Sequence, residues 1–318
     1  MSAEYLVFQS IDLSQSGKTI DSMAVLGAEG TYYMSEKNIY VATETDAWRK
    51  TKISRYSYEK GTIKYACEKV INGTILNQFS MDEYEGNLRF AATTYDDNGK
   101  TTNGLYIVDS SFKTIGSVSR LAPGERIYSA RFMGESVYFV TYRETDPLFL
   151  VDVSDPANPV VKDKLKIPGF SDYLHPFGEN MLLGIGSIQD KEGNSYVKLS
   201  MFDISNPEKV KEIHSKKLGK NTVQNMGSDH KGIVVDAERN RIAFGVENYD
   251  DTTDSFYEIF SYDKQKGFQN IAKLSLEESY STESRGLYIG DYFYLCKTSS
   301  GICVYDTKKY KKIRSIAY

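Results

Sequence analysis

The chain has 318 residues, of which 43 are acidic and 39 are Lys or Arg, and its formal net charge is −4. Charges of both signs are interleaved without a long run of either, so neither a nucleic-acid groove nor an anionic membrane patch is expected. No apolar run approaches the ~18 residues of a membrane-spanning helix and no signal peptide follows Met1, so we expect a soluble chain without membrane insertion.

The clearest pattern is an apolar or aromatic residue that is followed directly by an acid and then by a turn-rich stretch. Seven such pairs occur: Ile11-Asp12, Tyr58-Glu59, Val108-Asp109, Val151-Asp152, Phe202-Asp203, Tyr262-Asp263 and Tyr305-Asp306. Their acids are 47, 50, 43, 51, 60 and 43 residues apart. Repeats of roughly 40–50 residues are typical of propeller blades. Together with 25 Tyr and 15 Phe, which suit pleated sheets, they predict an all-β propeller of four-stranded antiparallel blades.

The first residues match only the outer half of such a repeat. Residues 5–13 resemble its third strand and residues 19–26 its fourth, whereas the first complete repeat begins near Tyr32. The prediction is therefore six complete repeats plus an N-terminal half repeat, in a ring of six or seven blades. Because a ring short of two inner strands leaves open sheet edges, we expect residues 1–318 to form one propeller domain of a longer protein.

The repeat that begins at Ile127 shows the strand order most clearly. Residues 127–132, 137–142 and 148–153 are rich in β-branched and aromatic residues, and a short outer strand follows at 160–167. Asp and Pro residues between the last two strands favour a turn. The same order recurs in residues 173–212, 242–263 and 286–318.

Signatures of catalysis and of metal binding are missing from the sequence. There is no Gly-x-Ser-x-Gly elbow and no His-Glu-x-x-His motif. The three cysteines are too few for a disulfide framework and lack metal-ligand spacing. We expect buried thiols, and a disulfide between Cys296 and Cys303 across a hairpin is the alternative. An enzyme is therefore not the favoured class.

Polar residues gather in the predicted innermost strands, which line the central channel of a propeller. The candidates for a ligand-binding set at the channel mouth are Asp82, Glu83, Arg126, Arg131, Asp172, His175, Asp229, His230 and Arg285. No catalytic residue and no metal ligand is assigned among them. The alternative, which we favour, is that these side chains bond to water or to one another, because channel walls are wet.

Two loops, residues 95–99 and 248–254, carry clustered oxygen donors of the kind that calcium prefers. Neither loop has the acid spacing of a calcium-binding loop with a distal Glu. We expect ordinary polar hairpin tips and no cofactor, with calcium as the alternative.

Four strings of sequence resemble one group of proteins. They are NQFSMDEY (77–84), LAPGERIYS with RFMG (121–134), DPLF (146–149) and LKIPGFSDYLHP (165–176). The chain resembles the secreted bacterial proteins that carry a C-terminal β-propeller distantly similar to WD40 repeats. The resemblance implies an exported or surface-attached protein without established activity, although the export signal and the upstream propeller sequence are not in this chain.

Two classes of function follow from these observations. The first is a non-catalytic scaffold, extracellular or on the cell surface, that binds a protein, a glycan or the upstream domain of its own parent protein. The second is a polysaccharide hydrolase or lyase with carboxylates at the channel mouth. Asp82, Glu83 and Asp229 would then be its acids, because such chemistry needs two carboxyl groups about 5–10 Å apart.

Overall fold

The computed structural model describes residues 4–15, 17–27, 29–45, 49–96, 98–142, 146–249, 254–276, 284–297 and 300–317. Their helices are single 3-10 turns, η1 (Leu13–Gln15), η2 (Gln78–Ser80) and η3 (His230–Gly232). No helix in these ranges is long and apolar enough to cross a membrane. The chain divides into two compact units, Met1–Arg143 with Phe149–Lys162 and Glu144–Leu148 with Asp163–Tyr318. A single propeller domain stays a prediction.

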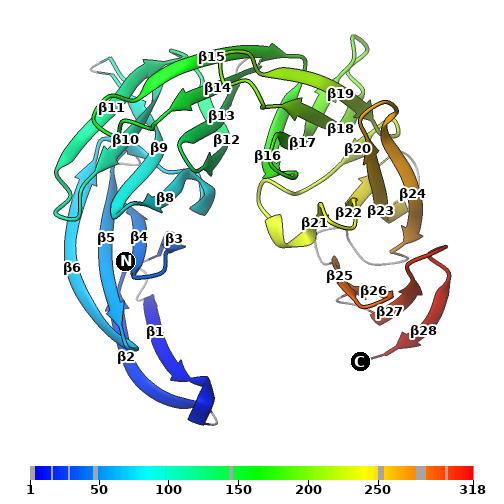
Figure 1. The fold of residues 1–318 in the computed structure, drawn as a ribbon, viewed down its shortest axis with the longest axis horizontal. Coiled ribbons are helices and arrows are strands. Elements are labelled where there is room, and N and C mark those ends of the chain that lie inside the picture. Colours follow the sequence, from blue (N-terminus) through cyan, green and yellow to red (C-terminus); the bar gives the residue numbers. More distant parts are fainter. Residues whose placement is uncertain are drawn as a thin grey trace. The chain divides into compact units, whose positions relative to one another are not determined.

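The first unit consists of antiparallel sheets that follow one another along the chain (Figure 1). A two-stranded sheet comprises β1 (Tyr5–Asp12) and β2 (Lys18–Leu26), and the next comprises β3 (Thr31–Met34), β4 (Asn38–Glu44), β5 (Thr51–Glu59) and β6 (Thr62–Ile71). The third contains β7 (Gly73–Thr74), β8 (Met81–Tyr84), β9 (Asn87–Tyr95), β10 (Thr101–Val108) and β11 (Thr114–Leu121). The fourth contains β12 (Arg126–Met133), β13 (Ser136–Tyr142), β14 (Asp146–Asp152) and β15 (Val160–Ile167), and parts of β14 and β15 belong to the second unit.

The second unit repeats the same meander. Its sheets are β16 (Phe170–Pro176), β17 (Met181–Gln189), β18 (Ser195–Asp203) and β19 (Lys211–Lys217); β20 (Thr222–Val223), β21 (Val234–Asp236), β22 (Arg241–Asn248), β23 (Asp254–Asp263) and β24 (Gly267–Ser275); and β25 (Ser284–Ile289), β26 (Tyr292–Lys297), β27 (Gly301–Asp306) and β28 (Lys312–Ile316). Six sheets of four or five strands and one of two strands confirm the predicted six repeats and half repeat.

The acid of the repeat closes the turn after the third strand. Its carboxylate accepts a hydrogen bond of 2.8–3.0 Å from the backbone N–H two residues later at Asp12, Asp109, Asp152, Asp203, Asp263 and Asp306. Asp side chains favour such turns for this reason. Glu59 differs, because β5 and β6 are joined by the two-residue turn Lys60-Gly61, in which both residues have positive φ.

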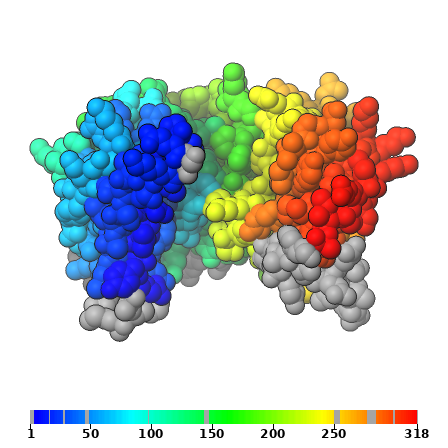
Figure 2. Space-filling model, turned by 90° about the horizontal axis from the view of Figure 1, so that it is seen from below, coloured from blue at the N-terminus to red at the C-terminus, as the bar shows by residue number. Residues whose placement is uncertain are grey.

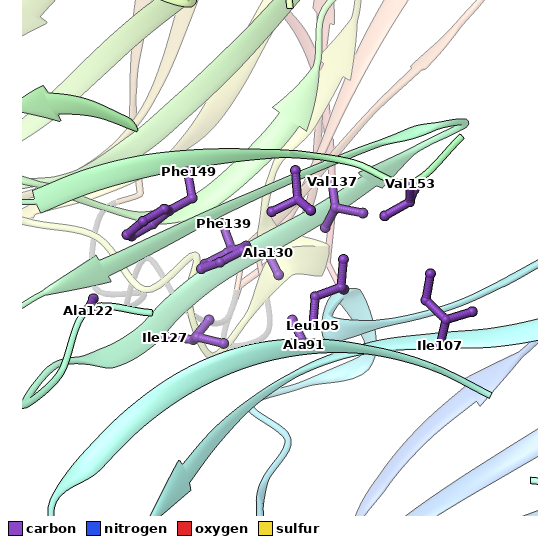
Figure 3. Packing of buried hydrophobic residues seen from close by; sticks show 11 residues of the cluster. Ala91, Leu105, Ile107, Ala122, Ile127, Ala130, Val137, Phe139, Phe149 and Val153 are labelled. Atoms are coloured by element: carbon purple, nitrogen blue, oxygen red, sulfur yellow. The ribbon is translucent and has the colours of Figure 1, made fainter. Parts of the chain in front are cut away.

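Apolar side chains fill the space between neighbouring sheets of the first unit (Figure 3). Leu105 on β10 lies in one cluster with Val137 and Phe139 on β13, and all three are fully buried. The rings of Phe139 and Phe149 stack with centroids 5.1 Å apart. Each fully buried side chain of this size stabilises the fold by roughly 1.5–3 kcal/mol, so face-to-face packing of successive sheets holds the repeats of the first unit together.

The β1–β2 sheet packs as the outer half of a blade would. Leu6, Phe8, Met23 and Val25 pack on a cluster of the β3–β6 sheet, and the Phe8 and Tyr56 centroids are 5.0 Å apart. Asp21 on β2 accepts the Ile63 backbone N–H at 2.7 Å. In the second unit Asp163, on a fourth strand, accepts the Val210 N–H at the same distance. Figure 2 shows β1–β2, in dark blue, at the surface.

The three cysteines form no disulfide; Cys303 is buried as expected, whereas Cys67 and Cys296 are half-buried. The register of β26 and β27 pairs Cys303 with Leu295 and Cys296 with Ile302. Since successive residues of a strand point to opposite faces, the two thiols lie on opposite faces of the sheet and cannot form the hairpin disulfide.

Candidate functional site

Glu83, on β8, accepts hydrogen bonds from three side chains of the β3–β6 sheet. Its carboxylate lies 2.7 Å from Ser35 Oγ, 2.9 Å from Asn38 Nδ2 and 2.8 Å from Tyr40 Oη. The backbone N–H of Glu83 also donates to Tyr33 Oη at 2.9 Å. Burial, followed by the bond to Glu83, raises the pKa of Tyr40. Glu83 therefore links two neighbouring sheets, and it also lines a cavity of about 620 Å³ beside the β3–β4 turn.

Asp82 precedes Glu83 on the strand and so points to the other face of the sheet. It forms an ion pair with Arg89, whose side chain is only 3% exposed. Arg89 Nη1 also donates to the Gly134 carbonyl at 2.6 Å, in the turn between β12 and β13. The Arg89 guanidinium lies 4.4 Å from the Tyr84 ring centroid. Glu83 thus bonds directly to one neighbouring sheet, whereas Asp82 pairs within its own sheet with Arg89, which in turn reaches the next sheet.

The two predicted arginines of the first unit lie on β12. Arg131 packs its guanidinium over the Phe79 ring, 3.9 Å from the centroid. Arg126 is exposed at the first position of the strand. A guanidinium over an aromatic ring is a stabilising contact in its own right, so Arg131 has a packing role.

In the second unit, Asp172 is the extra residue of a β-bulge between β16 and β17, because Ser171 pairs with Gly186 and Tyr173 with Ile185. A bulge re-aims the side chain it carries. Gln224 Nε2 donates to Asp172 Oδ2 at 2.7 Å, and burial raises the pKa of Asp172 to about 6. His175 Nδ1 lies 2.9 Å from Tyr173 Oη. Asp172 is thus the candidate acid whose protonation changes near neutral pH.

Asp229 and Arg285 lie 56 residues apart in the chain but are in contact in the fold. Arg285 Nη2 donates to Asp229 Oδ1 and its Nη1 lies beside Oδ2, both at 2.9 Å. The prediction that His230 lies in an innermost strand was wrong, because it opens the 3-10 turn η3 ahead of β21. That turn is fixed where Tyr257 Oη donates to the Gly232 carbonyl at 2.7 Å.

Of the nine candidate residues, the structure shows Asp229 and Arg285 in contact with each other, while Asp82, Glu83, Arg131, Asp172 and His175 contact residues outside the set. Asp229 meets Arg285, whereas Asp82 and Glu83 diverge to opposite faces. A single pocket lined by all nine residues stays a prediction. In the described ranges no group of three or more His, Cys, Asp or Glu could hold a metal ion. Calcium stays untested, because residues 97 and 250–253 of the two loops lie outside the described residues.

Sequence reasoning missed a second cavity, of about 450 Å³, between β6 and the sheet of β9, β10 and β11. Its only signal in the sequence is a glycine in mid-strand, Gly104, which often marks a bulge or a close approach.

The model of the beta propeller domain family matches residues 1–310 of this chain. An uncharacterized protein of Methanocaldococcus jannaschii is 47% identical over 150 residues, which are 46% of this chain and 24% of that protein. An uncharacterized protein of Archaeoglobus fulgidus is 34% identical over 287 residues, 90% of this chain and 41% of that protein. The chain therefore spans less than half the length of these relatives. Both are archaeal, so the bacterial and secreted parts of the sequence resemblance, and its relation to WD40 repeats, stay predictions.

Two solved structures share the fold. BamB from Moraxella catarrhalis has a TM-score of 0.52 and 9% identity, covering 95% of this chain and 80% of its own. A putative 6-phosphogluconolactonase from Bacteroides uniformis has a TM-score of 0.51 and 10% identity, and the match covers 98% of this chain and 95% of that protein. At such low identity these likenesses concern the fold alone. The match over residues 1–310 and the repeated four-stranded sheets together show that the chain belongs to the beta propeller domain family.

Proposed function

We propose that the chain is a non-catalytic interaction scaffold of an extracellular or surface-attached protein, and that its β1–β2 sheet receives a polypeptide partner. The observation that carries this proposal is the bare apolar face of that sheet. Tyr5, Val7 and Leu26 are 66%, 60% and 62% exposed, while the alternate residues of the strands pack inward. A contiguous exposed apolar face marks an interaction site.

The comparison with another third strand supports this proposal. In β14 the successive residues Phe149, Leu150 and Val151 are all buried, so both faces of that strand are covered. In β1 only one face is packed. Within the described residues β1 also pairs with β2 alone, which leaves its other edge open to further strands.

We favour strands from elsewhere in a longer parent protein as the partner. The relatives are more than twice as long as their aligned regions, so they have ample sequence for an added strand pair. Such strands would bind by adding to the β1 edge, with main-chain hydrogen bonds giving affinity and the apolar face giving specificity. A separate protein or a glycan would be a different outcome of the same experiment.

Hydrogen exchange tests the proposal. We expect the β1 amides to exchange faster in residues 1–318 than in the longer protein, and Val7→Lys to destabilise the longer protein while leaving residues 1–318 nearly unaffected. Thr62→Lys, at the exposed start of β6, is the control. Equal β1 exchange in both proteins would refute the strand partner. Protection of β1 by an added protein or glycan would instead assign the face to that ligand.

The alternative function, a hydrolase or lyase acting on polysaccharide, draws support from Asp172 alone. A carboxyl group with a pKa near 6 suits a general acid. Its bonded neighbour Gln224 is a neutral amide, however. Asp82 is occupied in the ion pair with Arg89 of its own sheet, and Glu83 in hydrogen bonds to the neighbouring sheet. Release of reducing ends from a polysaccharide panel, lost in Asp172→Asn, would establish the enzyme and displace the scaffold.

A further inference from the structure

The 450 Å³ cavity of the first unit has a distinct origin in the sheet beneath it. Gly104 on β10 pairs with Ala92 on β9, so two small residues face each other at one point of the sheet. The flanking pairs on the same face are Phe90 with Tyr106 and Thr94 with Thr102, and these four residues line the cavity. The small residues leave room for the Tyr106 ring to lie flat over Gly104, and the cavity lies between this ring and β6. Its size falls within the roughly 300–1,000 Å³ of small-molecule sites.

The floor of this cavity is flat and aromatic. Tyr106 lies along its strand over Gly104, where a methyl group would come within 2.9 Å of Tyr106 Oη. The rings of Phe90 and Tyr106 stack with centroids 5.4 Å apart and an interplanar angle of 21°. Such a surface suits the face of a planar or apolar ring.

Two cations stand at the cavity, one on each side. Lys69 Nζ, from β6, donates to the Phe112 carbonyl at 3.0 Å. Arg120 lies at a β-bulge opposite Gly104, because Asn103 pairs with Leu121 while Leu105 pairs with Val118. Arg120 forms no salt bridge with any described residue. The acid at the cavity, Asp96, accepts the backbone N–H groups of its own turn.

The bulge is held in a costly backbone conformation. Arg120 has a φ of 60°, in the left-handed region that non-glycine residues rarely adopt. Fully buried Asn103 braces it, donating from Nδ2 to the carbonyls of Leu121 and Glu125 at 3.2 Å each. Strained residues that are braced in this way cluster at ligand sites.

We propose that this cavity binds a small organic anion with a planar ring. The ring lies on Tyr106, which stacks on the buried ring of Phe90, and the anionic group meets Arg120 and Lys69. The cavity gathers two cations and one acid, so its charge complements a single carboxylate, sulfonate or phosphate. This proposal concerns a different face of the molecule from β1–β2 and does not depend on the scaffold function.

Calorimetry with three probes tests the ligand class. The probes are 2-naphthalenesulfonate, which has ring and anion, 2-naphthalenemethanol, which has the ring alone, and methanesulfonate, which has the anion alone. We expect 2-naphthalenesulfonate to bind most tightly. Absence of saturable binding of 2-naphthalenesulfonate at millimolar concentration, or equal affinity for all three probes, would overturn the proposal.

The variant Arg120→Gly removes the cation and keeps the left-handed backbone, which glycine adopts freely. We expect it to weaken 2-naphthalenesulfonate about fivefold and to leave 2-naphthalenemethanol unchanged, with Arg120→Lys intermediate. Lys60→Gly is the matched control, since Lys60 is an exposed cation at a φ of 50° outside the cavity. If Lys60→Gly weakened the sulfonate as much as Arg120→Gly, general charge attraction would explain the binding and the assigned site would be wrong.

Discussion

Tyr40 donates its phenolic hydrogen to Glu83 Oε2 at 2.8 Å, from one sheet of the first unit to the next. Tyr40 is almost fully buried, so its hydroxyl has no access to bulk water. A buried donor that loses its partner costs about 1–3 kcal/mol, and Glu83 also holds Ser35 and Asn38. This contact therefore makes Glu83 a structural residue at the boundary between sheets.

We expect Glu83→Ala to lower the free energy of unfolding by about 3 kcal/mol and Glu83→Gln to lower it less, because the amide keeps one acceptor oxygen. Urea unfolding measures both changes. Glu36→Ala, which removes an exposed acid beside the same cavity, is the control. If Glu83→Ala were as stable as Glu36→Ala, the structural role would be refuted.

Asp82→Asn is expected to be strongly destabilising, by about 3 kcal/mol, because it leaves the Arg89 charge buried without a counter-ion. The double variant Asp82→Asn with Arg89→Met should recover part of this loss, since no buried charge remains. Glu68→Gln, in the exposed pair with Lys52, should cost less than about 1 kcal/mol. Additive losses in the double variant would show that the two residues do not act as a pair.

The Asp residues that close the turns after the third strands predict that the protein loses stability at low pH. Hydrogen bonds that Ser205 donates to the carboxylate, from its hydroxyl first and then from its backbone N–H, lower the pKa of Asp203. Since the folded state binds this proton less readily than the unfolded chain, the stabilisation is present above the unfolded pKa of about 4 and is lost as the pH falls through the folded value.

We therefore expect Asp203→Asn to destabilise the protein at pH 7 and to match the wild type at the acid end of the titration. Unfolding curves at a series of pH values measure the difference, with the exposed Glu238→Gln as control. A difference that did not change with pH would argue against this role for the carboxylate.

The pKa of Asp172 is shifted in the opposite direction from that of Asp203, so its effect on stability has the opposite dependence on pH. Burial raises its pKa from 3.8 to about 6, so keeping it ionised costs stability above pH 6, and this cost disappears below the unfolded value. We expect Asp172→Asn to stabilise the protein by about 2–3 kcal/mol at pH 8 and to have little effect near pH 3.5. Calorimetric melting at the two pH values measures this. Destabilisation at pH 8 would mean that the Gln224 contact outweighs the cost of burying the charge.

The repeat spacing was enough to predict the six larger sheets, the N-terminal half repeat and the turns after the third strands. Those features depend on local signals: alternating apolar residues, and an Asp whose carboxylate reaches a backbone N–H two residues away. The same local information could not assign the polar residues. Asp82 and Glu83 look like one acidic pair in sequence, but the pleat sends them to opposite faces, toward partners 43 to 48 residues away in the case of Glu83.

The sequence by itself thus determined where the strands lie, their order along the chain and the number of repeats. These features follow from the spacing of the repeat and from the residues that form its turns. Only the tertiary structure decided that Cys296 and Cys303 lie on opposite faces, that His230 sits in a 3-10 turn, and that a cavity lies between β6 and the Tyr106 ring over Gly104. The physical reason is register: a shift of one residue exchanges the two faces of a strand, and register is fixed by packing between strands rather than by the residues of one strand.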